Sequence, residues 1–393
     1  MAPDSTPNTG AGGAFGHGDE PPGDETPGGG ASPDTGWRAR LAGGRLEPIL
    51  RWESALVLAL VAVILLGNSI SPQFHSSYNL FTAQTNIGDL AIMALPMTLI
   101  IITGEIDLSV ASTLALSAEL LGDLWLHHWP LALIFVVCLA VGAACGFVNG
   151  FLITRLGLPS LAVTIGTLTL YRGLANVVLG STSVSTFPSF WTGAGVIGAF
   201  GTTWLSWSMV FFVVLAVIVG VVLKWTSLGH SLYAIGLNEE AAFHAGIRVK
   251  RIKMSLYVVS GIVCAAVGIL YAFELASAAE NIAIGFELQV VTIVLLGGVS
   301  IFGGKGSVLG VFLAALVYAG LRSGLLLTSS FTENDFQIVS GGLLVLSVLV
   351  PNAAEFAGRG RDMIARRRAQ GRLAAGASES AGAPASGGRG GDG

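Results

Sequence analysis

Charged residues are scarce in this chain. Of its 393 residues, only 11% are Asp, Glu, Lys or Arg, whereas hydrophobic types make up 52%. A soluble domain carries roughly 25% charged residues, because charge covers its surface. The deficit therefore excludes an ordinary soluble enzyme. Glycine is frequent, with 54 residues, but it follows no collagen-like repeat, which excludes a fibrous protein.

Cysteine is also rare, and the motifs of common catalytic sites are missing. Cys138, Cys145 and Cys264 all fall in apolar stretches, where we expect packing residues rather than disulfides or metal ligands. No His-Glu-x-x-His or Gly-x-Ser-x-Gly motif occurs. The string nearest to a P-loop has Val299 at the first Gly position and Gly306 where a hydroxyl is needed, which predicts a tight turn instead. We therefore predict no enzyme activity, no catalytic residue, no metal and no cofactor.

The two ends of the chain differ from its middle. Residues 1–36 contain no Lys or Arg and are rich in Gly, Pro and acidic residues, so we predict a disordered acidic tail over 1–45. Residues 356–393 are basic and then Ala/Gly/Ser-rich, which predicts a second disordered tail. The remaining 46–355 are predicted to form a membrane domain.

Long apolar runs fill this middle region. A helix needs about 20 mostly apolar residues to cross a bilayer. The ten predicted spans are 53–71, 79–103, 108–126, 131–154, 160–180, 204–224, 252–276, 286–302, 306–327 and 336–350. The second is interrupted by Gly88, Asp89 and Pro96, and the eighth by Gly297 and Gly298. The sequence thus predicts an all-α, polytopic membrane helical bundle.

The basic residues orient this bundle. Arginines precede the first span and follow the last, so the positive-inside rule places both termini in the cytoplasm and requires an even number of spans. Alternating the ten spans also brings Arg155, Lys224, Lys305 and the basic cluster at 248–253 to the cytoplasmic side, whereas the opposite loops contain no Lys or Arg. The distribution of charge is therefore consistent with ten spans.

One long internal loop, at 225–252, is predicted to lie on the cytoplasmic side. Asn238 is a favourable N-cap, and Glu239 and Glu240 follow in the first turn, where the helix dipole favours carboxylates. Ala241 and Ala242 continue a short helix, which Gly246 is placed to end. An ordinary amphipathic loop is the alternative interpretation.

Four stretches carry a resemblance to a known family. They are NEEAA followed by Gly (238–246), TGEIDLSVAS (103–112), PSLAVTIGTLTLYRGLA (159–175) and LLGGVSIFGGKGSVLG (295–310). The first resembles the coupling-helix loop of permeases in binding-protein-dependent ABC importers. The others are similar to motifs of the branch that carries ribose, xylose, rhamnose and related sugars. The resemblance covers about 53–351, and Glu105, where many relatives have Gly, looks most like the rhamnose-type permeases.

This resemblance implies a function and a set of partners. It implies a permease in the bacterial inner (plasma) membrane that moves a monosaccharide, rhamnose-type favoured, by alternating access. A separate ATP-binding subunit would contact the 238–246 loop, and an extracytoplasmic sugar-binding protein would dock on the opposite side. It also implies a second permease copy or a homologous permease, and no nucleic acid. The alternative is an ion-coupled secondary transporter, which would depend on Asp89 or Asp107.

Polar residues at membrane depth are candidates for the substrate path, because burying them in lipid is costly. The candidates are Asn86, Asp89, Asp107, Thr167, Tyr171 and Arg172. Arg172 could instead pair with a carboxylate to hold the bundle, and Asp107 could cap the helix that follows it. Glu274 and Glu287 flank a predicted outer loop and could meet the binding protein.

Overall fold

The computed structural model describes residues 47–193, 197–328 and 330–349. The predicted tails at 1–45 and 356–393 lie outside these residues. Within them the elements are helices, and the only strand-like pairing is an isolated antiparallel bridge between Val184 and Ala278. The predicted all-α helical bundle is therefore confirmed.

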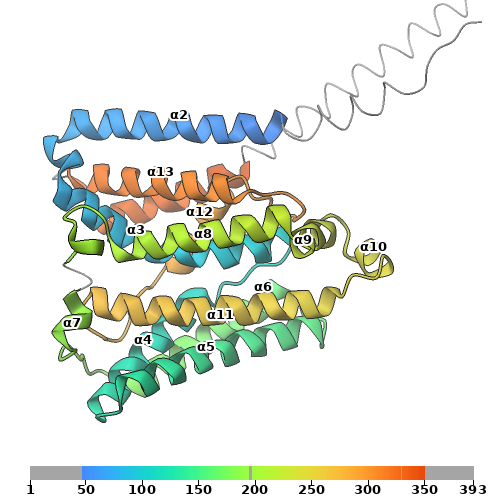
Figure 1. Ribbon diagram of the computed structural model, residues 1–393, viewed down its shortest axis with the longest axis horizontal. Helices are drawn as coiled ribbons and strands as arrows, with labels where there is room; N and C mark the ends of the chain where they lie inside the picture. The colour runs from blue at the N-terminus through green and yellow to red at the C-terminus, as the bar shows by residue number, and fades with distance from the viewer. Residues whose placement is uncertain (1–46, 194–196, 329, 350–393) are drawn as a thin grey trace, which may run out of the picture. The chain divides into compact units, whose positions relative to one another are not determined.

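The predicted spans coincide with helices (Figure 1). The elements are α2 (Glu47–Ile70), η1 (Pro72–His75), α3 (Ser77–Ile102), α4 (Val110–Leu126), α5 (Leu131–Thr154), α6 (Ser160–Leu179), α7 (Ser189–Thr192), η3 (Ala199–Gly201), α8 (Trp207–Trp225), α9 (Ser227–Leu237), α10 (Glu239–His244), α11 (Val249–Glu274), α12 (Phe286–Leu296), α13 (Val308–Leu326) and a last helix at 333–349. Among the described residues, seven helices are long and apolar enough to cross a membrane: α2 from Trp52, α3, α5, α6, α8, α11 and α13. α4, α12 and the last helix are shorter, so the count of ten spans stays a prediction.

Helix α3 is the central element of the bundle. In its apolar stretch 89% of the residues are buried, against 11% in α2. It packs against α8, α11, α12 and α13. Pro96 removes one backbone N–H but does not end the helix, which runs unbroken to Ile102. Close packing on all sides thus keeps helical a segment that its sequence marks as interrupted.

Small residues bring α5 and α11 into direct backbone contact. A Cβ added at Gly142 would lie 2.4 Å from the carbonyl oxygen of Gly261, and one at Gly146 would lie 2.1 Å from that of Tyr257. Only glycine permits this approach, as in other small-residue spacings between membrane helices. The spacing therefore packs the bundle internally.

Two non-helical segments interrupt the helical pattern, at 103–109 and 297–307. α12 ends at Leu296, six residues before the predicted span end at 302, because Gly298 adopts a left-handed φ of +82°. Gly303 and Gly304, at φ +80° and +72°, form the predicted turn. The two segments meet where the Gly304 N–H donates to the carbonyl of Ile102 at 2.9 Å.

The bundle has two distinct ends. α9 and α10 lie at one end of α8 and α11, which we call the α10 end, and α7 lies at the other, the α7 end (Figure 1). The last helix begins near the α7 end with a capping box. The Thr332 N–H and hydroxyl donate to Asp335 at 2.8 and 2.7 Å, and these bonds lower the pKa of Asp335.

Candidate functional site

The 238–246 loop forms the capped helix that its sequence predicts. The Asn238 side chain accepts a hydrogen bond from the Ala241 N–H at 2.9 Å, and Glu239 and Glu240 occupy the first turn of α10. Ala242 is buried, whereas Glu240 and Ala241 are exposed. After α10, the chain turns at Gly246, whose φ is +86°. α10 therefore presents an exposed face at the end of the bundle that carries both carboxylates and the apolar side chain of Phe243.

Helix α9 fixes α10 to the two non-helical segments. A Cβ at Gly236 would lie 1.9 Å from the carbonyl oxygen of Ile102 and 2.3 Å from the amide nitrogen of Gly304. The Tyr233 hydroxyl donates to the carbonyl of Gly306 at 2.8 Å, and burial raises the pKa of Tyr233. The backbone of α9 thus lies directly against the end of α3 and against segment 297–307, with almost no side chain between them.

A buried lysine joins α10 to segment 103–109. Lys253, in the second turn of α11, donates to Glu105 at 2.6 Å and to Glu239 at 2.7 Å. Its side chain is 5% exposed, against 16% for that of Glu105 and 56% for that of Glu239. One cation therefore holds a residue of the motif at 103–112 and the first residue of α10.

A polar cavity of about 1220 Å³ opens near the α7 end. It is formed by the start of α3, the end of α11, the following loop, α12, α13 and the last helix. Asn86 and Asp89, both predicted for the substrate path, line it, together with Thr85 and Gln289. The volume exceeds the roughly 300–1,000 Å³ usual for small-molecule sites, so it can admit a monosaccharide.

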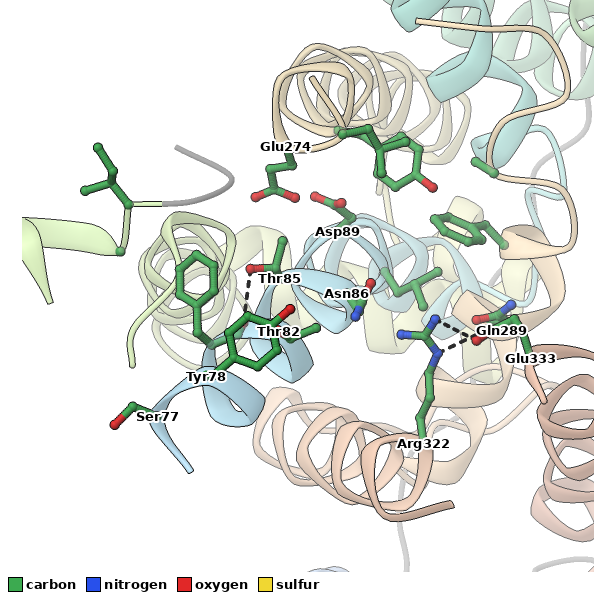
Figure 2. Close-up of a pocket in the computed structure, with 18 of the residues that line it drawn as sticks. Ser77, Tyr78, Thr82, Thr85, Asn86, Asp89, Glu274, Gln289, Arg322 and Glu333 are labelled. Atoms are coloured by element: carbon green, nitrogen blue, oxygen red, sulfur yellow. Dashed lines mark hydrogen bonds and ion pairs between the residues drawn. The ribbon is translucent and has the colours of Figure 1, made fainter. Parts of the chain in front are cut away.

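Two carboxyl groups face one another at the wall of the polar cavity, Asp89 from α3 and Glu274 from α11 (Figure 2). Gly88 allows α8 to approach α3, and there the Ser208 hydroxyl donates to Glu274. Asp89 Oδ1 and Glu274 Oε2 are buried and accept no hydrogen bond from the described residues. Both oxygens are closed off from the cavity in this conformation, and the two carboxyl groups interact with each other instead.

An ion pair lies beside these groups in the same cavity. The Arg322 guanidinium of α13 donates to both carboxylate oxygens of Glu333, at 3.2 and 3.0 Å (Figure 2). The two hydrogen bonds are bidentate and fix the orientation of the Arg322 guanidinium at the wall of the cavity.

The other four residues predicted for the substrate path lie outside the polar cavity. Asp107 accepts hydrogen bonds from the Ser109 N–H and hydroxyl at 3.0 and 2.7 Å, and from the Ser260 hydroxyl at 3.3 Å. The Thr167 hydroxyl is buried and donates to its own helix, while the Tyr171 hydroxyl donates to the carbonyl of Cys145 at 3.0 Å. In this conformation Asp107 and Tyr171 connect different elements, whereas Thr167 bonds only within α6.

The hydrogen-bond partners of Arg172 are backbone carbonyls, whereas the sequence suggested a carboxylate partner as the alternative to a place on the substrate path. Its guanidinium donates to the backbone carbonyl of Ile282 at 2.5 Å and to that of Ala283 at 3.5 Å, in the loop after α11. Ala283 lines the polar cavity. Arg172 thus ties the end of α6 to the loop that closes one side of the cavity.

Sequence reasoning missed two features of these sites. The contact of Lys253 with Glu105 spans 148 positions, and no local pattern indicates it. Glu119, in α4, is fully buried, and neither of its carboxylate oxygens has a hydrogen-bond partner among the described residues. Its position within an apolar predicted span was the one available signal, because a carboxylate in such a span is costly.

The chain matches a family of transport proteins. The model of the family described as "Branched-chain amino acid transport system / permease component" matches residues 79–348. Autoinducer 2 import system permease protein LsrD of Klebsiella pneumoniae is 33% identical over 76% of this chain and 91% of that protein. LsrD of Photorhabdus temperata is 31% identical over 81% and 96%, and ribose import permease protein RbsC of Haemophilus influenzae is 30% identical over 76% and 93%. No solved structure matches the chain.

The apolar helices define a multi-pass membrane protein, and the family match places it among transport proteins. The chain belongs to the permease-component family that the comparison identifies. It is therefore a transport subunit, not an enzyme.

Proposed function

We propose that this chain is the permease subunit of an ATP-binding cassette importer that moves a small sugar across the bacterial inner (plasma) membrane by alternating access. The observation that carries the proposal is the capped and largely exposed helix α10, which lies at the α10 end, whereas the polar cavity opens near the α7 end. An exposed, preformed helix of this kind suits contact with a separate ATPase. An ion-coupled carrier would not need it.

The polar cavity supports a hydroxyl-rich substrate. The facing carboxyl groups of Asp89 and Glu274 and the amides of Asn86 and Gln289 together provide hydrogen-bond donors and acceptors. Sugar hydroxyls match such a mixed lining, since each can donate to a carboxyl oxygen and accept from an amide. The substrate path would therefore begin at Asn86 and Asp89.

The proposal includes three kinds of partner. A cytoplasmic ATP-binding subunit would contact Asn238, Glu239, Glu240, Ala241, Ala242 and Gly246. An extracytoplasmic sugar-binding protein would dock at the α7 end, close to the mouth of the polar cavity. A second permease copy or a homologous permease would complete the transmembrane part. Both termini would then lie in the cytoplasm.

The identity of the sugar rests on the relatives rather than on Glu105. The similar proteins are named for import of autoinducer 2 and of ribose. Glu105 favoured a rhamnose-type substrate in the sequence, but it pairs with Lys253 and does not line the polar cavity. Ribose, autoinducer 2 and rhamnose are therefore the substrates to compare.

The test measures ATP hydrolysis by the assembled permease and ATPase in proteoliposomes, with the binding protein loaded in turn with ribose, autoinducer 2 or rhamnose. We expect one of the three to stimulate hydrolysis and to enter the vesicles. No stimulation and no uptake with any of them would contradict a sugar importer of this type.

Asp89→Asn and Glu274→Gln test the place of the polar cavity on the path. Each replaces one carboxyl group of the facing pair by an amide, and the loss of one buried hydrogen-bond partner costs about 1–3 kcal/mol, so we expect uptake of the stimulating sugar to fall at least ~10-fold. Gln73→Glu, on η1 outside the polar cavity, serves as the control and should transport normally. Normal uptake by both cavity variants would show that the substrate path does not pass Asp89 and Glu274.

A further inference from the structure

The contact of Lys253 with two carboxylates has no role in the function described so far. A lysine that is 5% exposed must be compensated, because an unpaired charge inside a protein is strongly unfavourable. Here Glu105 and Glu239 provide the compensation from two different elements. If α10 moves and the Lys253–Glu239 ion pair breaks, Lys253 keeps Glu105 as its one partner. If that ion pair is kept, Lys253 has to move together with α10, and Glu105 has to follow or lose its own ion pair.

Segment 103–109 connects Glu105 to three membrane helices. The Ile106 N–H donates to the Ser160 hydroxyl of α6 at 3.4 Å, and the Thr164 hydroxyl donates to the Ile106 carbonyl at 3.4 Å. Ser109 accepts a hydrogen bond from Asn149 of α5 at 2.8 Å. Asp107 is held by Ser260 of α11, as described above. The segment is thus bonded to α5, α6 and α11, whereas its own backbone is not helical.

Helix α6 extends this connection towards the polar cavity. Its first turns hold Ile106 through Ser160 and Thr164, and near its other end Arg172 holds the carbonyls of Ile282 and Ala283. A helix transmits a displacement along its axis with little internal change. Motion that enters at Glu105 can therefore reach the loop beside the cavity.

We propose that Lys253 is a positioning residue for coupled transport, through which movement of α10 reaches segment 103–109 and, along α6, the polar cavity. The inference rests on the proposed function, since it takes the ATPase contact at α10 as given. It assigns to Glu105 a role in transmission, whereas the sequence resemblance connects that residue with substrate type. Glu105 and Lys253 form the inner part of the link, and Glu239 forms the part that faces the ATPase.

The simplest rival is that the ion pairs only stabilise the fold. The two interpretations differ in coupling. A stabilising contact, once removed, lowers the amount of assembled transporter but leaves the sugar carried per ATP unchanged in what remains. A transmitting contact, once removed, leaves ATPase association intact and lowers the sugar carried per ATP.

The experiment uses the full permease with its ATPase and binding protein in proteoliposomes, and ribose, autoinducer 2 or rhamnose as the sugar probe, whichever stimulates the wild type. Lys253→Met, Glu105→Gln and Lys253→Arg are compared with Lys250→Met. Lys250 is an exposed residue of the same helix and has no ion pair among the described residues. Measured are ATPase co-purification, ATP hydrolysis with and without sugar-loaded binding protein, and sugar uptake.

For Lys253→Met and Glu105→Gln we expect normal ATPase co-purification and normal basal hydrolysis. We also expect at least a tenfold loss of sugar carried per ATP. Lys253→Arg should recover most of the coupling, and Lys250→Met should behave like the wild type. Unchanged sugar per ATP in Lys253→Met would overturn the proposal, and so would loss of assembly in both Lys253→Met and Glu105→Gln, which would assign the contact to folding. If the wild type itself shows no ATP-driven uptake, the proposed function fails instead.

Discussion

At the scale of single residues, charged side chains inside the bundle follow two patterns. Lys253, Asp107 and Arg172 have well-defined partners and connect elements. Asp89, Glu274 and Glu119 instead have oxygens without a hydrogen-bond donor among the described residues, and of these three Asp89 and Glu274 line the polar cavity. Buried polar groups in proteins are nearly always hydrogen-bonded, so unpaired oxygens beside a cavity indicate a place for a ligand or for water.

Gly236 gives a prediction at the same scale. Gly236→Ala places a methyl group 1.9 Å from the Ile102 carbonyl oxygen, which the packed backbones cannot accommodate. We expect α9 and α10 to be displaced, and both ATPase co-purification and sugar uptake to be lost. Pull-down of the ATPase by the purified variant measures the first effect, and vesicle uptake the second.

Gly220→Ala is the matched control, because a Cβ at Gly220 meets no atom within 4 Å. Alanine is favoured over glycine in helices by about 1 kcal/mol, so this variant should transport normally and be at least as stable. Normal ATPase binding and uptake in Gly236→Ala would show that the close contact with Ile102 is dispensable.

At the scale of elements, α10 is a helix of six residues and depends on its ends. Isolated helices shorter than about 12 residues are marginal in water. Asn238→Ala removes the bond to the Ala241 N–H and should cost about 1 kcal/mol of helix stability. We expect weaker ATPase co-purification and reduced uptake, whereas Asn238→Asp, which keeps an acceptor, should retain both. Equal behaviour of the two variants would show that the cap does not matter for ATPase contact.

Elements with local signals are those that the sequence predicts well. The cap at Asn238, the acidic first turn and the turn at Gly246 depend on neighbouring residues only, and α10 forms as predicted. The predicted span 79–103 contains Pro96, and tertiary packing keeps α3 helical through that residue. α12, by contrast, ends just before Gly297 and Gly298, because Gly298 adopts a left-handed φ that a helix cannot contain.

Partners across the chain are what the sequence could not provide. Asn86 and Asp89 were predicted for the path and do line the polar cavity. Tyr171 and Arg172 were predicted for the same path, but the fold directs them to the backbone carbonyls of Cys145 and Ile282. Whether a polar side chain lines the cavity or bonds to a backbone carbonyl depends on residues more than 25 positions away in the sequence. Amphipathic periodicity carries no information about such distant partners.

At the scale of the whole molecule, the two ends are built differently. The α10 end gathers α9, α10 and the two non-helical segments through glycine contacts and the Lys253 ion pairs. The polar cavity lies near the α7 end and is lined by titratable and amide side chains. Alternating access requires such a separation, since energy enters at one end and substrate at the other.

The most direct test of this account is uptake of radiolabelled sugar by proteoliposomes that contain the permease, its ATPase and ATP inside, with loaded binding protein outside. The account predicts accumulation that requires all of these components and is unaffected when ionophores collapse the proton and sodium gradients. Accumulation by the permease alone, driven by an imposed ion gradient and lost in Asp89→Asn, would contradict it and identify an ion-coupled carrier.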